Sequence, residues 1–212
     1  VRSVTDIHAA KESGRNGLMY GFQYGVCFDT DLDRLETFHR LGIRVIQPTY
    51  NRHNRLGDGC MEPQDAGLSK VGHEAVERMN ELGILVDASH CGRVTAANAI
   101  RHSKLPVAFT HTGCAALADH PRNRTDAELR AVANTGGVSG IYVMPYLAGG
   151  RQPTAADVVR HIEHAVNVAG EEHVSIGTDG TLSAVALTPE FVQSFTANVA
   201  RRKAAGIAAP QE

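Results

Sequence analysis

Two histidines each close a short apolar segment of this chain. The first segment runs from Ile84 to His90, and the second runs from Pro106 to His111. Both segments are short, apolar and bounded by Gly or Pro, which is typical of buried strands in a parallel sheet. Because neighbouring parallel strands end at the same edge of a sheet, we expect both imidazoles at one rim, where such sheets bind ligands and metals.

Other polar residues follow further predicted strands. Gln23 ends the first strand, Tyr50 follows the second, and Asp179 lies between glycines in Ile176–Gly180. Neutral imidazoles bind Zn²⁺ well, and a catalytic zinc needs about three protein ligands and a position for water. A bound metal lowers the pKa of its water to about 7, and an Asp nearby can accept the proton. These residue types together predict metal-assisted hydrolysis.

Each of these residues also has a simpler interpretation. A single His after an apolar run is more often a hydrogen-bonded core or rim residue, so the site depends on the second His and on Asp179. Arg122 follows the second His strand and suits bidentate binding of a carboxylate, although most Arg side chains are solvated surface groups. His161 and His164 lie one helical turn apart, and we expect them on a solvated helix face.

Alternating strands and helices must position these side chains. We expect strands over residues 17–23, 44–47, 84–87, 106–110, 137–143 and 173–177. We expect helices over residues 3–13, 29–41, from Ser69 onward, 93–101, 125–134, 154–169 and 188–205. This alternation predicts a parallel sheet covered by helices. Two architectures remain open, a (β/α)₈ barrel that lacks two strands and a doubly wound sheet, and the polar strand ends favour the barrel.

The composition limits the class of protein. The chain has 212 residues with 42% hydrophobic residues, which predicts a single globular domain over residues 1–212. Its formal net charge of −2 gives no basic field for nucleic acid, and no apolar run approaches the roughly 20 residues of a membrane span. The four cysteines show no CxxC spacing, so we expect free thiols in a reducing compartment, the cytoplasm.

Long segments of the chain resemble the membrane (renal) dipeptidase family of metallopeptidases, family M19, and its bacterial branch in particular. The matching segments are GFQ at 21–23, LGIRVIQPTYNRHNRLGDGC at 41–60, DAGLSKVGHEAVERMNELGILVDASHCG at 65–92, PVAFTHTG at 106–113, HPRNRTDAELR at 120–130 and HVSIGTDG at 173–180. The resemblance implies a (β/α)₈ TIM barrel of the metal-dependent hydrolase type. It also implies one or two Zn²⁺ ions, hydrolysis of dipeptides, including those with a C-terminal D-residue, and a possible homodimer.

The resemblance also assigns roles to single residues. His90 and His111 match the two histidines that bind the second metal, and Arg122 matches the arginine that holds the terminal carboxylate of the substrate. Asp179 matches the acid that moves a proton from the attacking water to the leaving amine. Tyr50 stands where mammalian members have a substrate-contacting His, and its phenol can donate a hydrogen bond to the polarised carbonyl oxygen.

Two departures from the family pattern are informative. Gln23 stands where the family has a bridging Glu, and an uncharged amide with one acceptor oxygen is a poor bridge between two cations. The chain has no His-x-Asp pair, so we expect the family's first strand before Val1. The family's closing segment after the last barrel strand is also missing, so we expect either a fragment or a naturally shortened protein. Two alternatives to a dipeptidase follow. One is a degenerate, non-catalytic barrel that acts as a binding protein, and the other is a mononuclear hydrolase of non-peptide amides or lactams.

Overall fold

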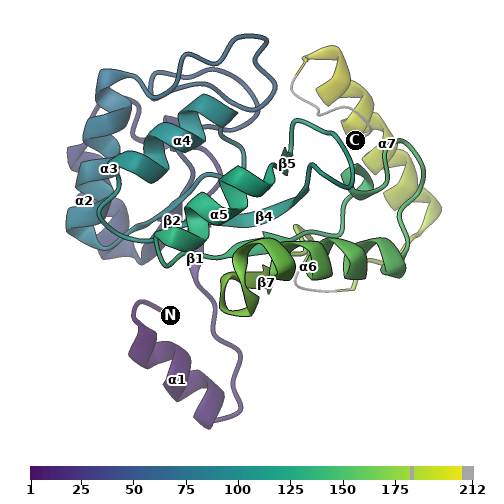
Figure 1. The fold of residues 1–212 in the computed structure, drawn as a ribbon, viewed down its shortest axis with the longest axis horizontal. Coiled ribbons are helices and arrows are strands. Elements are labelled where there is room, and N and C mark those ends of the chain that lie inside the picture. The colour runs from purple at the N-terminus through teal and green to yellow at the C-terminus, as the bar shows by residue number, and fades with distance from the viewer. Residues whose placement is uncertain (182–183, 207–212) are drawn as a thin grey trace. The chain divides into compact units, whose positions relative to one another are not determined.

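The computed structural model describes residues 1–181 and 184–206, which form a chain of alternating strands and helices (Figure 1). The strands are β1 (Tyr20–Phe22), β2 (Ile43–Ile46), β3 (Leu85–Asp87), β4 (Val107–Cys114), β5 (Asn123–Arg124), β6 (Ser139–Ile141) and β7 (Val174–Ile176). The α-helices are α1 (Val4–Glu12), α2 (Asp33–Leu41), α3 (Lys70–Leu82), α4 (Arg93–His102), α5 (Asp126–Asn134), α6 (Ala155–Ala169) and α7 (Pro189–Ala204). Short 3₁₀ helices are η1 (Gly25–Cys27), η2 (Pro145–Leu147) and η3 (Glu171–His173).

The chain divides into two compact units. The first comprises Val1–Ala108 with Thr135–Gly137, and the second comprises the described parts of Phe109–Asn134 and Val138–Glu212. In the first unit, β1 pairs with β2, β2 with β3, and β3 with the first two residues of β4, all in parallel. Helix α2 packs against β2, and α3 packs against β3. The expectation of one domain over residues 1–212 stays a prediction.

The second unit continues the same parallel pattern. The rest of β4 pairs with β6, β6 pairs with β7, and the short β5 pairs with the end of β4. Helix α6 packs against β6 and β7 and contacts α5. In both units the main strands follow chain order, whereas a doubly wound sheet reverses that order at a switch point. The predicted α/β fold with a parallel sheet is therefore confirmed.

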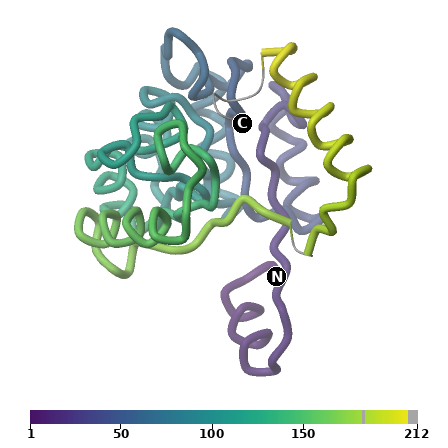
Figure 2. Tube along the Cα trace, turned by 90° about the vertical axis from the view of Figure 1, so that its right-hand side faces the viewer, coloured from purple at the N-terminus to yellow at the C-terminus, as the bar shows by residue number. Residues whose placement is uncertain are grey.

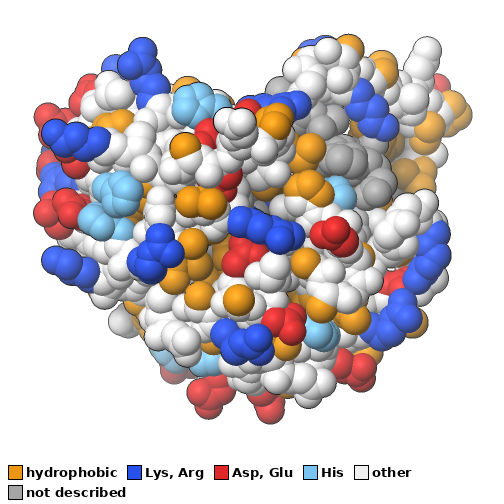
Figure 3. Space-filling view, turned by 45° about the horizontal axis from the view of Figure 1, so that its top comes forward, with side chains coloured by type: hydrophobic (Ala, Val, Ile, Leu, Met, Phe, Trp, Pro, Cys, Tyr) orange, Lys and Arg blue, Asp and Glu red, His pale blue; other side chains and the backbone are white. Residues whose placement is uncertain are grey.

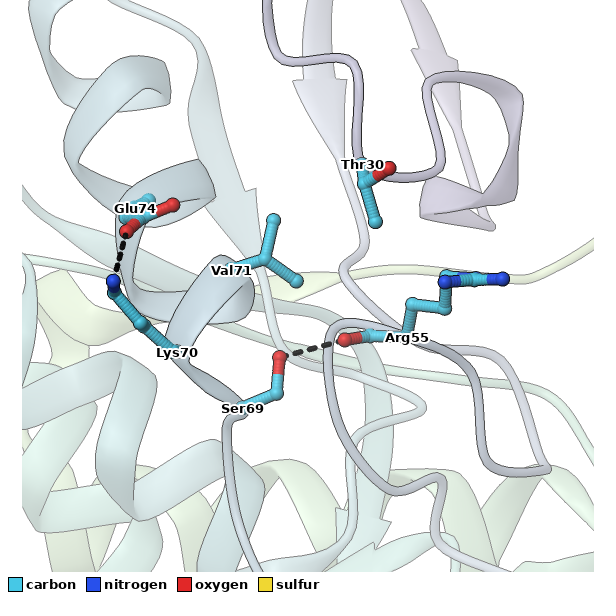
Figure 4. A pocket seen from close by; sticks show the side chains of 6 residues that line it. All are labelled: Thr30, Arg55, Ser69, Lys70, Val71 and Glu74. Atoms are coloured by element: carbon cyan, nitrogen blue, oxygen red, sulfur yellow. Dashed lines mark hydrogen bonds and ion pairs between the residues drawn. The ribbon is translucent and has the colours of Figure 1, made fainter.

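Helix α3 shows how local sequence sets the element boundaries. The Ser69 side chain accepts a hydrogen bond from the Gly72 N–H at 3.0 Å and so caps the N-terminus. The same hydroxyl donates to the Arg55 carbonyl at 2.6 Å, which ties the helix to the preceding loop (Figure 4). Gly83 ends the helix with φ of +67°, a left-handed conformation that favours glycine. The predicted helix start at Ser69 is confirmed.

Most predicted elements are present, with shifted boundaries. The helix expected from Asp29 begins only at Asp33, because Asp29 has φ of +50° and cannot belong to a right-handed helix. Strand β4 does not end near His111 but continues to Cys114, where β5 pairs with it. Strand β5 itself has only two residues, too few to show a periodic pattern.

Helix α1 differs from the other helices of the first unit because it buries none of its residues. It lies apart from α2, α3 and α4 in both ribbon views (Figures 1 and 2). Figure 3 shows cationic and anionic side chains interspersed on the visible face, in keeping with the small net charge. No helix within residues 1–181 and 184–206 combines the length and apolar character that crossing a membrane requires.

Candidate active site

His90 lies in the turn after β3. Two consecutive residues of the loop between β2 and α3, Tyr50 and Asn51, hold it in place. Its Nδ1 is 2.7 Å from Asn51 Oδ1, and its ring stacks on the Tyr50 ring with centroids 4.1 Å apart and planes 24° apart. An amide oxygen only accepts hydrogen bonds, so His90 donates from Nδ1. Metal ligation by this imidazole would therefore use Nε2, the arrangement that a second ligand shell usually imposes.

The loop that carries Tyr50 and Asn51 is fixed against His90 by its backbone. The Cys60 N–H donates to the His90 carbonyl at 2.9 Å, and Gly59 forms an isolated antiparallel bridge with Cys91. A Cβ atom at Gly59 would collide with the Tyr50 carbonyl oxygen, so only glycine allows this close approach. The loop between β2 and α3 thus supports His90 directly through Tyr50, Asn51 and Cys60.

Asp87, at the end of β3, orders the turn that leads to His90. Its buried carboxylate accepts hydrogen bonds from Gln47 Nε2 at 2.7 Å and from the Ser89 N–H and hydroxyl. Sequence reasoning missed both Asp87 and Asn51. The signal for Asp87 was a single acid at the end of an apolar run, where burial of a carboxylate requires such partners.

In the second unit, His111 lies inside β4 and is buried. Its Nδ1 is 2.8 Å from Thr110 Oγ1, a hydroxyl that can donate or accept, so Nδ1 is engaged and a metal would meet Nε2. Gly177, which follows β7, packs against this strand: its Cβ would lie 3.2 Å from His111 Cα and would collide with the Thr110 carbonyl. Asp179 comes two residues later, is exposed, and has φ of +55°. This unit therefore brings His111 and the Gly177–Asp179 segment to the same region of the sheet.

Arg122 lies just before β5 with only 2% of its surface exposed. The backbone N–H of Arg122 donates a hydrogen bond to His120 Nδ1 at 3.1 Å, and its backbone carbonyl accepts one from Thr112 Oγ1 at 3.0 Å. From the sequence alone, Arg122 could also be an ordinary solvated surface residue. Its burial excludes that alternative. A buried guanidinium suits recognition of a carboxylate, because charge-assisted hydrogen bonds strengthen away from water.

The prediction of a solvated face for His161 is wrong. This side chain is buried, accepts from the Cys114 N–H through Nδ1 at 2.9 Å, and lies 3.1 Å from the Leu147 carbonyl through Nε2. Burial holds the pKa of His161 below its usual value. His164 is half-buried and its Nε2 lies 2.7 Å from Asp126 Oδ1. The His161 imidazole therefore links α6 to Cys114 in β4 and to Leu147 in η2.

A catalytic zinc site requires about three protein ligands close together. Gln23 follows β1 and is exposed. Within residues 1–181 and 184–206, no group of three or more His, Cys, Asp or Glu side chains is arranged to hold a metal ion. His90 and His111 each have the ring chemistry of a ligand, but the described residues alone do not complete a catalytic metal site. The four cysteines are free thiols, as predicted.

The chain matches the model of one protein family and is similar to several known proteins. The model of the membrane dipeptidase family, peptidase family M19, matches residues 1–204. An amidohydrolase from Pseudomonas aeruginosa is 41% identical with a TM-score of 0.82, and a metallo peptidase from Rhodobacter sphaeroides, liganded with a phosphinate mimic of the dipeptide L-Ala-D-Ala, is 26% identical with a TM-score of 0.80. The dipeptidase verJ of Clonostachys rogersoniana is 35% identical over 147 residues.

These similarities cover most of this chain but only part of its relatives. The matches span 88% and 99% of this chain for the two solved structures, and 68% for verJ. They span 57% of the amidohydrolase, 63% of the metallo peptidase and 38% of verJ. The chain therefore spans less than two thirds of the length of each of these three relatives.

Proposed function

Because the chain belongs to the membrane dipeptidase family, peptidase family M19, we propose that it acts in the metal-dependent hydrolysis of dipeptides. The observation that carries this proposal is the family match over residues 1–204. The related metallo peptidase that holds a dipeptide mimic supports the substrate class. A (β/α)₈ barrel is the architecture that we propose for the complete fold, since both units keep their main parallel strands in chain order.

Two side chains serve the substrate and the proton in this proposal. The buried guanidinium of Arg122 binds the terminal carboxylate and so fixes the position of the scissile bond. Asp179, which is exposed after β7, accepts a proton from the attacking water. The water oxygen bonds to the carbonyl carbon, the C–N bond breaks, and Asp179 delivers the proton to the leaving amine.

The candidate metal ligands are His90 and His111 through Nε2, with Gln23 offering at most one amide oxygen. Zinc, as one or two ions, is the metal that we propose, because imidazoles suit it well. The described residues supply no three-donor group, so His90 and His111 would need further ligands to hold a catalytic zinc. Tyr50 stacks on His90, and we propose that its hydroxyl donates a hydrogen bond to the substrate carbonyl.

A metal and activity measurement on a double variant tests this function. We expect the His90→Ala, His111→Ala double variant to lose bound zinc and hydrolysis of L-Ala-D-Ala together. His164→Ala is the matched control, because that histidine pairs with Asp126 and carries no proposed role. Full zinc retention in the double variant, measured by elemental analysis, would contradict the ligand assignment.

A second candidate function is a non-catalytic barrel that binds dipeptides. The exposed Gln23 and the absence of a three-donor group among the described residues favour it. A dipeptide panel with and without chelator separates the two functions. Turnover that disappears with chelator and returns with zinc supports the hydrolase, whereas binding without turnover supports the non-catalytic alternative.

A further inference from the structure

The peptide groups on both sides of Arg122 are held by side chains. The Arg122 N–H donates to His120 Nδ1 at 3.1 Å, and the Arg122 carbonyl accepts from Thr112 Oγ1 at 3.0 Å. The backbone conformation of a residue limits its side-chain rotamers and sets the direction of its Cα–Cβ bond. These two hydrogen bonds therefore restrict where the guanidinium of Arg122 can reach.

The His120 ring is itself fixed in place. Only 4% of the residue is exposed, and the imidazole stacks on the Tyr146 ring with centroids 4.3 Å apart and planes 8° apart. Tyr146 belongs to η2 and is buried. Because an N–H donates to Nδ1, this nitrogen carries a lone pair rather than a proton. His120 thus presents a fixed acceptor to the backbone of Arg122.

Asn123, on the other side of Arg122, is equally constrained. Its Nδ2 donates to the Ala118 carbonyl at 2.7 Å and to the Tyr146 carbonyl at 3.0 Å, and its Oδ1 accepts from the Tyr142 hydroxyl. The same residue pairs with β4 in the sheet. Arg122 therefore lies between two residues that contact Tyr146, and this segment has little freedom to shift.

We infer that His120 is a positioning residue for Arg122, and that it strengthens recognition of a substrate's free C-terminal carboxylate. The inference rests on the proposed function, in which Arg122 binds that carboxylate. His120 does not touch the substrate in this account. His120 accepts a hydrogen bond from the backbone N–H of Arg122 and so limits the direction of the guanidinium. Supporting residues act in this way at preorganised sites.

Two variants separate the acceptor from the ring stack. His120→Phe keeps an aromatic ring against Tyr146 but removes the acceptor, whereas His120→Asn places an amide oxygen near the position of Nδ1. We expect His120→Phe to raise KM for L-Ala-D-Ala by about 10-fold with a smaller change in kcat. We expect His120→Asn to stay within about threefold of the wild type. The opposite order would show that stacking alone matters and would overturn the inference.

Thr112→Val provides a second route if His120→Phe does not fold. It removes the hydroxyl that donates to the Arg122 carbonyl while keeping the side-chain volume, and the same rise in KM is expected. The unfolding midpoint of each variant in urea reports its folding. A normal KM in a folded Thr112→Val or His120→Phe variant would contradict the inference.

The substrate carboxylate supplies the most specific control. L-Ala-D-Ala amide lacks this group, so the difference between wild type and His120→Phe should disappear with the amide. The difference should also disappear in an Arg122→Ala background. An equal loss on acid and amide would show a general structural effect and would overturn the inference.

The outcome for the wild type separates this inference from the proposed function. Where the wild type binds dipeptides without turnover, Kd from calorimetry replaces KM with the same expected ratios. A wild type that neither binds nor hydrolyses L-Ala-D-Ala overturns the proposed function, and this inference with it. Normal wild-type behaviour combined with an unaffected His120→Phe variant overturns the inference alone.

Discussion

Cys114 is a buried thiol at the end of β4. Burial raises the pKa of Cys114 to about 12, and the nearby Asp126 carboxylate acts in the same direction. The thiolate is the nucleophile that attacks iodoacetamide and displaces iodide, and the thiolate fraction at pH 8 falls as the pKa rises. We therefore expect Cys114 to resist iodoacetamide at pH 8 in the native protein and to react after unfolding. Half-buried Cys60 is the internal control, and peptide mass spectrometry measures both. Equal native-state alkylation of the two thiols would contradict this.

Residue types alone identified the two buried histidines as a pair worth testing, but not the side chains that hold them. Asn51 contacts His90 although the two residues lie 39 positions apart, and no local sequence pattern predicts such a contact. His161 was misplaced for a related reason. A histidine in an amphipathic helix is assigned to the polar face, yet this imidazole finds a donor and an acceptor inside the second unit.

At the scale of elements, the N-cap of α3 gives a direct stability test. Ser69→Ala removes the cap of the Gly72 N–H and the link to the Arg55 carbonyl, so we expect a loss of about 1–2 kcal/mol in the free energy of unfolding. Ser3→Ala is the matched control. Ser3 caps α1, which buries no residue, so its loss should change global unfolding by less than about 0.5 kcal/mol. Urea titration followed by circular dichroism compares the two, and equal losses would contradict the argument.

The end of β7 provides a second element-scale prediction. Gly177→Ala would force a Cβ into the Thr110 carbonyl, so we expect at least about 3 kcal/mol of destabilisation or failure to fold. Gly180→Ala is the control, since its Cβ would meet nothing nearer than 3.4 Å. Thermal unfolding of both variants checks this, and a wild-type midpoint for Gly177→Ala would show that Gly177 does not approach β4 as described.

Strands β2 and β3 were predictable because they are short apolar runs next to glycines and turns. Strand β5 was not, because two residues carry no periodicity and both side chains are polar. Its existence depends on the pairing of Gly113 with Asn123. The extension of β4 to Cys114 has the same origin. Partners that are distant in sequence, rather than propensity, decide where these elements end.

At the scale of the whole molecule, stability should be distributed unevenly along the chain. Helices α1 and α7 bury no residues among those described, whereas α4 buries four: Thr95, Ala96, Ala99 and Ile100. Regions with few buried apolar contacts open at low free-energy cost. Amide hydrogen exchange followed by mass spectrometry should therefore label α1 and α7 within seconds to minutes, while α4 peptides stay protected much longer. Similar protection in α1 and α4, which differ in length by one residue, would contradict this.

The overall class of fold was accessible from the sequence because alternating periodicities report parallel α/β architecture. The choice between a barrel and a doubly wound sheet was not, because strand order depends on pairing that no single segment encodes. The structure supplies that order within each unit: strands β1, β2 and β3 pair in sequence, and so do β4, β6 and β7.

The left-handed backbone of Asp179 determines how its role can be studied. Asp29 and Asp179 are the non-glycine residues with positive φ in the described chain. Alanine at position 179 would remove the carboxylate and also strain the backbone, so a loss of activity would have two causes. Asparagine tolerates this conformation far better and keeps the side-chain shape. Asp179→Asn paired with Asp179→Gly therefore separates the chemistry of the acid from the geometry of the turn that carries it.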